Sequence, residues 1–116
     1  MKILFHVDQE DRWGVCLGNI YNTLKYYEDK EEAIRLEVVV NAVAVRELSK
    51  TGAADAGLLD EMSEYIRRGV RIVACRNALT GQNIKDEDLV EGVEVVPAAI
   101  IEMAEKQNEG WAYIRP

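Results

Sequence analysis

The sequence has 116 residues, of which 48% are hydrophobic and 30% charged, and its formal net charge is -7 at pH 7. This length and balance are typical of one globular domain, residues 1–116, with enough apolar surface for a core without disulfides or a structural metal. The acidic charge argues against nucleic acid as a partner, because phosphate contacts need clustered Lys and Arg. The one basic cluster, Arg67, Arg68 and Arg71, is short and flanks a glycine, so we interpret it as a solvated helix end.

The first half of the chain alternates between strand and helix patterns. A short apolar run at residues 3–5 predicts a buried strand, and a loop follows it. Apolar residues then recur at helical spacing over residues 13–27, which predicts an amphipathic helix. Residues 36–40 are rich in β-branched residues and predict a second buried strand, and residues 42–49 are expected to form a helical turn.

The second half continues this alternation. Thr51 and Gly52 are expected to interrupt the turn, and a helical stripe over residues 58–66 then ends at a glycine cap. The remaining patterns predict strands at 70–74, 93–96 and 111–114, a short helix at 77–82 and a turn at 86–89.

The last helix is expected to begin at Pro97, whose fixed φ suits a first helical position. Its buried stripe is expected to consist of Ile100, Ile101 and Ala104, with Met103 beside them. Strands that alternate with helices favour parallel βαβ units with helices on both faces of the sheet.

Ligands of open parallel sheets bind beyond the carboxyl ends of the strands. Polar or distinctive residues follow the apolar runs at these ends, and they are expected to share one rim. The residues concerned are His6, Asp8, Asn41, Cys75, Arg76, Asn77 and Pro97.

Cys75 is the residue with the strongest case for chemistry. It ends the strand at 70–74 and precedes a short helix, whose backbone N–H groups favour an anion and lower the pKa of a thiol. Arg76 adds a nearby cation, and Asn77 is expected to cap the helix. A thiolate at Cys75 could accept a sulfane sulfur, whereas in the alternative interpretation Cys75 only fills the top of the core.

His6 and Cys16 each have a chemical and a structural interpretation. His6 is expected either to line a pocket with Asn41 and act as a base, or to be a core histidine with satisfied hydrogen bonds. Cys16 lies one position from the apolar stripe of the first helix, which favours a core position. A resolving role toward Cys75 requires that the two sulfurs come within bonding geometry.

The sequence predicts neither a metal site nor a cofactor. Two cysteines outside a CxxC motif and a single histidine do not complete a zinc site, and the glycines at residues 14–18 lack the spacing of a phosphate loop. The acidic run at 86–88 is interpreted as a helix N-terminus. No signal peptide and no apolar run of about 20 residues are found, so we expect a cytoplasmic protein with reduced cysteines and no membrane contact.

Several segments together resemble the DsrE/DsrF-like family. The more specific ones are Cys-Arg-Asn-Ala at residues 75–78 and Glu-Gly-Trp-Ala-Tyr at residues 109–113. The opening Phe-His-Val at residues 5–7, the segment 13–22 and the segments 84–89 and 95–98 fit the same family, so the resemblance covers nearly the whole chain.

The resemblance implies a three-layer α/β/α fold around a five-stranded parallel sheet, and homo-oligomers that are typically trimers or hexamers. Sulfur-handling members carry sulfane sulfur as a persulfide on the cysteine that matches Cys75, and they exchange it with donor and acceptor proteins. The predicted function is therefore a small sulfur-relay protein rather than a self-sufficient enzyme, since the chain offers one histidine and no clear acid–base pair. The alternative is a ligand-binding or structural subunit of an oligomer, without sulfur chemistry of its own.

Overall fold

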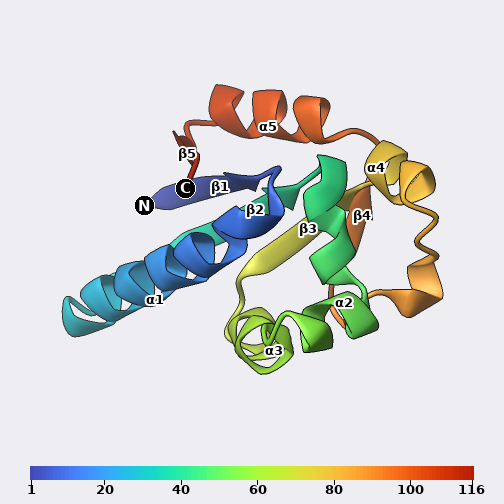
Figure 1. The fold of residues 1–116 in the computed structure, drawn as a ribbon. Helices are drawn as coiled ribbons and strands as arrows, with labels where there is room; N and C mark the ends of the chain where they lie inside the picture. Colours follow the sequence, from blue (N-terminus) through green and yellow to red (C-terminus); the bar gives the residue numbers. More distant parts are fainter.

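The computed structural model describes residues 1–116, and its five strands form one parallel sheet in the order β4-β3-β2-β1-β5 (Figure 1). The strands are β1 (Lys2–Val7), β2 (Arg35–Val40), β3 (Arg71–Cys75), β4 (Glu94–Val96) and β5 (Ala112–Ile114). The α-helices are α1 (Trp13–Asp29), α2 (Lys50–Asp55), α3 (Leu59–Arg67), α4 (Arg76–Gly81) and α5 (Ala99–Asn108). Short 3-10 helices span Glu10–Arg12, Ala42–Leu48 and Asp86–Asp88.

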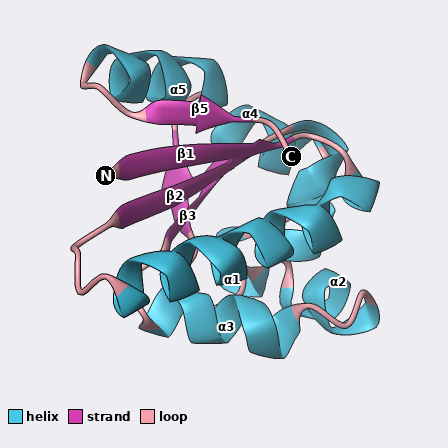
Figure 2. Cartoon of the chain, turned by 90° about the vertical axis from the view of Figure 1, so that its left-hand side faces the viewer, coloured by secondary structure: helices cyan, strands magenta, loops and turns pink.

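The sheet separates two apolar cores because successive side chains of a strand point to opposite faces. The larger core has 23 buried residues and lies between the sheet and α1, α2 and α3. The smaller core has 8 buried residues and lies between the other face and α5. Figure 2 shows these helices on the two sides of the sheet, so the three-layer α/β/α fold with a five-stranded parallel sheet is confirmed.

The amphipathic first helix is confirmed. The buried residues of α1 are Trp13, Cys16, Leu17, Ile20 and Leu24. The indole N–H of Trp13 donates to the backbone oxygen of Ala44 at 3.1 Å, which ties the start of α1 to the 3-10 helix after β2. None of the helices combines the length and the apolar character needed to cross a membrane.

The expected interruption at Gly52 is wrong, because α2 runs through it. The Ser49 side chain caps α2 by accepting a hydrogen bond from the Gly52 backbone N–H at 3.0 Å. A Cβ at Gly52 would overlap the backbone oxygen of Arg46. The glycine therefore permits the close approach of α2 to the preceding 3-10 helix rather than breaking the helix.

The predicted start of the last helix is also wrong. Pro97 lies before the helix, Ala98 is the N-cap, and α5 begins at Ala99. Ala98 has an extended backbone, with φ -154° and ψ 129°, so the chain leaves β4 through two non-helical residues before it turns.

The buried side of α5 differs from the predicted stripe. Ala99 and Met103 lie one turn apart and face the sheet, with 2% and 6% of their surfaces exposed. Ile100 and Ile101 are instead 68% and 55% exposed, and Ala104 is exposed as well. Apolar residues occupy most of the circumference of this helix, so their spacing alone did not determine which side is buried.

Candidate functional site

Three of the predicted rim residues, His6, Asn41 and Cys75, lie at the carboxyl ends of β1, β2 and β3, on the face of the sheet that α5 covers. Cys75 ends β3 and is the N-cap of α4, and it pairs in register with Val96 of β4. The β2–β3 register places Val40 opposite Ala74, so the next step along both chains brings Asn41 beside Cys75. The register therefore puts the amide of Asn41 next to the end of the strand that carries the thiol.

His6 forms a hydrogen-bonded chain with two residues from other strands. Its Nε2 lies 3.0 Å from Oδ1 of Asn41, and its Nδ1 lies 2.7 Å from the hydroxyl of Tyr113 in β5. An amide oxygen only accepts, so His6 donates from Nε2, and the Tyr113 hydroxyl is the hydrogen-bond partner of Nδ1. Both ring nitrogens are thus occupied, and His6 holds the side chain of Asn41 in place.

Tyr113 takes part in these hydrogen bonds, which the sequence did not predict. Its strand, β5, pairs with β1 and places Tyr113 in register with Leu4, two residues before His6. Both termini of the described chain thus meet at the edge of the sheet. The sequence carries a signal for β5 itself, but not for its position beside the first strand.

The Cys75 side chain lies in the smaller apolar core and is 7% exposed. Its partners in this core are Leu4, Val39, Val73, Val96, Ala99, Met103 and Trp111. Two of these, Ala99 and Met103, belong to α5. Cys75 therefore shares a buried core with the first turns of α5, and we expect access to the thiol to depend on how firmly α5 is held to the sheet.

Arg76 and Asn77 lie in the first turn of α4, and both are exposed. The Arg76 guanidinium forms a bidentate ion pair with the Asp86 carboxylate, with hydrogen bonds of 2.6 and 2.8 Å. These bonds hold the pKa of Asp86 below its usual value. The prediction that Asn77 caps the helix is wrong, because Cys75 itself occupies the N-cap position.

Cys16 is a core residue, as one of its two interpretations predicted. It is fully buried, and burial raises the pKa of its thiol to about 12. Cys16 belongs to the larger core and Cys75 to the smaller one, so the two thiols lie on opposite faces of the sheet, and both are free. A resolving role of Cys16 toward Cys75 is therefore excluded in this fold.

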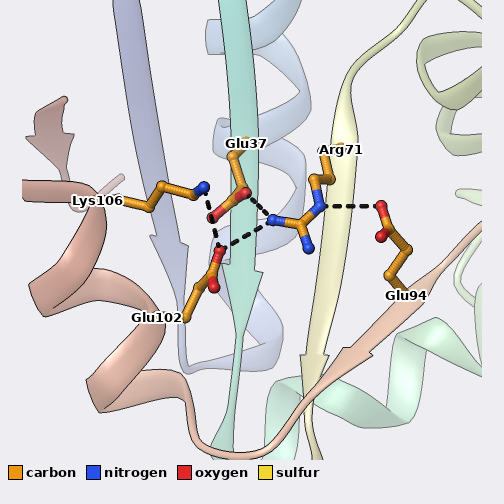
Figure 3. A network of polar contacts seen from close by, with 5 residues as sticks. All are labelled: Glu37, Arg71, Glu94, Glu102 and Lys106. Carbon is orange, nitrogen blue, oxygen red and sulfur yellow. Dashed lines mark hydrogen bonds and ion pairs between the residues drawn. The ribbon is translucent and has the colours of Figure 1, made fainter. Parts of the chain in front are cut away.

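A second polar cluster lies toward the amino ends of the strands (Figure 3). Arg71 stands four residues before Cys75 on β3, so the two side chains point to the same face of the sheet. The Arg71 side chain contacts three carboxylates: Nη1 lies 2.6 Å from Glu37 and 2.9 Å from Glu102, and Nε lies 2.9 Å from Glu94. Lys106 approaches Glu102 at 3.9 Å. The interpretation of Arg71 as part of a solvated helix end is therefore wrong, because it lies in β3 and crosses to α5.

Glu37 is the fully buried member of this cluster. Burial, and next the hydrogen bond with Glu102, raise the pKa of Glu37 to about 7, against the opposing effect of Arg71. One of its carboxylate oxygens, Oε2, is buried without a hydrogen-bond partner. A hydrogen bond between two carboxyl groups requires a proton on one of them, so we interpret Glu37 and Glu102 as a carboxylic acid–carboxylate pair.

The comparisons with known proteins agree with this fold. The model of the DsrE/DsrF-like family matches residues 5–116. Among solved structures, the chain is similar to MTH1491 of Methanobacterium thermoautotrophicum, a protein of unknown function. The TM-score is 0.86 and the identity 33%, over 99% of this chain and 98% of that one. No curated protein matches the chain.

Proposed function

Because the chain belongs to the DsrE/DsrF-like family, we propose that it is a sulfur-relay protein in which Cys75 carries sulfane sulfur as a persulfide. The observation that supports this proposal is the place of Cys75, at the carboxyl end of β3, an inner strand of the parallel sheet, and at the start of α4. Substrates of such sheets enter at these strand ends.

The proposed step exchanges one S–S bond for another. The Cys75 thiolate attacks the outer sulfur of a donor persulfide, the S–S bond of the donor breaks, and the donor cysteine leaves as a thiolate. The outer sulfur keeps its proton and becomes the persulfide of Cys75. Transfer onward follows the same course with Cys75 as the leaving group, so neither step consumes an oxidant or a reductant.

Asn41 and His6 would act by position rather than by proton transfer. His6 fixes the oxygen end of the Asn41 amide, which leaves the N–H groups of that amide free to donate beside Cys75. Amide donors at this place would stabilise the negative sulfur of an incoming or departing thiolate.

The test is mass spectrometry of the protein after incubation with a persulfide donor. We expect one added sulfur on Cys75, which a reductant removes, and none in the Cys75→Ser variant. The Cys16→Ala variant is the matched control and should acquire the same sulfur, because Cys16 is buried on the other face with a raised pKa. Sulfur on the Cys75→Ser protein, or none on the wild type, would contradict the proposal.

A second candidate role, a structural or ligand-binding subunit, is favoured by one observation. Cys75 is only 7% exposed and has apolar neighbours, as a packing residue would. In that case the wild type should stay free of added sulfur even with excess donor, and Cys75→Ala should preserve the oligomeric state. The same mass spectra therefore separate the two roles.

We also propose that copies of the chain associate, as a trimer or hexamer, through the exposed apolar side of α5. Ile100 and Ile101 leave more than half of their surfaces exposed, which is unusual for two adjacent isoleucines in an acidic monomer. We expect light scattering to give a multiple of the 13.1 kDa chain mass, and the double variant Ile100→Asp, Ile101→Asp to give the monomer. Exposed Val15 on α1 offers a matched control, since Val15→Asp should leave the assembly intact.

A further inference from the structure

One helix, α5, takes part in both the core that contains Cys75 and the buried acid cluster. Ala99 and Met103 pack in that core. Glu102, which lies between them in the chain, and Lys106, one turn later, enter the cluster around Arg71. A change in the protonation of the cluster therefore changes the interactions that hold α5 over Cys75.

The charges of this cluster do not balance when every group is ionised. Three carboxylates, those of Glu37, Glu94 and Glu102, share Arg71, and Lys106 provides only the looser contact of 3.9 Å.

The other elements around Glu37 provide little positive charge to balance the carboxylates. Its register neighbour in β1 is the apolar Leu4, and the Lys2 amine donates at 2.7 Å to the backbone oxygen of Glu109. Arg35, at the start of β2, is exposed and lies over the Trp111 ring at 5.3 Å. Arg71 is therefore the one cation in direct contact with Glu37.

Glu37 and Glu102 contact the same guanidinium nitrogen, so their carboxyl groups lie close together between the sheet and α5. With one proton between them, Glu37 donates to Glu102, and Arg71 neutralises the remaining charge. Without that proton, two carboxylates repel each other in a place where one of them has no contact with water. The simplest relief is for the Glu102 side chain to turn toward solvent, and α5 then loses the contacts that Glu102 makes with Arg71 and Glu37.

We propose that Glu37 and Glu102 form a pH-sensitive latch: their shared proton holds α5 over Cys75, and its loss loosens α5 and opens the thiol. The consequence for Cys75 rests on the proposed sulfur-relay function, whereas the latch itself does not.

The direction of the pH response follows from the protonation state of the Glu37–Glu102 pair. The pKa of Glu37, about 7, places the change near neutral pH. Below this value the pair keeps its proton and α5 stays closed; above it α5 loosens. A rise in pH therefore exposes Cys75.

Hydrogen exchange of the α5 amides tests the latch without any sulfur chemistry. We compare the exchange of α5 with that of α1 in the same sample, about one pH unit below and one above the pKa of Glu37, which cancels the intrinsic pH dependence of exchange. In the wild type we expect the ratio of α5 to α1 exchange to rise roughly fivefold to tenfold across this interval. The Glu37→Gln variant should keep one low ratio, because glutamine donates to Glu102 at both pH values.

Glu94→Gln is the matched control. Glu94 contacts Arg71 through Nε, its side chain is 54% exposed, and it does not contact Glu102 in the structure, so this variant should respond to pH as the wild type does. A wild-type ratio that stays constant across the interval would overturn the latch. So would a Glu37→Gln protein that responds as strongly as the wild type.

Alkylation of Cys75 by a small thiol reagent tests the consequence. We expect wild type and Glu37→Gln to react equally below the pKa of Glu37, and the wild type to react several-fold faster above it. If α5 responds to pH but Cys75 accepts no sulfur, the sulfur-relay function fails and the latch stands. If Cys75 accepts sulfur while α5 is indifferent to pH, the latch fails and the function stands.

Discussion

Replacing Arg71 with methionine is expected to lower the free energy of unfolding by about 3 kcal/mol, as found when one partner of a buried ion pair is removed. The loss arises because Glu37 is fully buried and Glu102 is largely so, and both lose the cation that contacts them. We place the effect at the low end for buried pairs because the Arg71 side chain is 36% exposed. Denaturant unfolding at neutral pH measures it as a lower midpoint with an unchanged slope.

Arg67→Met is the matched control for this substitution. Arg67 pairs with Glu64 on the surface of α3, where its side chain is 72% exposed, so its removal should cost no more than about 0.5 kcal/mol. The penalty of Arg71→Met should also shrink in acid, because protonated Glu37 and Glu102 no longer need a cation. Equal costs for the two variants would show that the cluster around Arg71 behaves as a surface ion pair.

The sequence predicted the strands and the layers well, and the reason is physical. Parallel strands buried on both faces are near-continuous apolar runs rich in β-branched residues, and such runs mark β3 and, apart from Glu37, β2. Strand order was less accessible, because short patterns do not encode which strand lies beside which. The pairing of β1 with β5, and with it the hydrogen bond between His6 and Tyr113, could be found only from the three-dimensional structure.

The acid cluster also has a signal in the sequence. Glu37 stands inside a run that is apolar on both sides of it, and a strand covered on both faces offers no exposed position for a carboxylate. A charged residue at such a place requires a partner, and Arg71 occupies the register position opposite it on β3. The two residues could have been paired once β2 and β3 were taken as neighbours.

The error in α5 has a different origin. The hydropathy of the adjacent Ile100 and Ile101 favoured burial of their side of the helix. The start of the helix at Ala99 and the path of the chain from β4 instead turned Ala99 and Met103 inward. Packing against the sheet buried Ala99 and Met103 and left Ile100 and Ile101 outside. Local spacing could not show this, because the side that is buried depends on how the helix is oriented over the sheet.

The stability of the wild type is expected to fall as the pH rises from about 4.5 to about 7, because of Glu37. Its pKa is about 7 in the folded protein against an ordinary value of 4.5, so within this interval the folded state binds more protons than the unfolded state. Stability then decreases with increasing pH, and a shift of this size corresponds to a loss of about 3 kcal/mol. The contribution is fully present below the ordinary value and is gone once the pH has risen through the folded one.

The Glu37→Gln variant isolates this effect from that of the other carboxylates. Surface acids such as Asp86, whose pKa is lowered by Arg76, act in the opposite direction at lower pH and are the same in both proteins. The difference between the two unfolding free energies, measured by denaturant at several pH values, should therefore change by about 3 kcal/mol between pH 4.5 and 7. A constant difference would mean that Glu37 is ionised throughout this interval, and the buried pair with Glu102 would then hold no proton to lose.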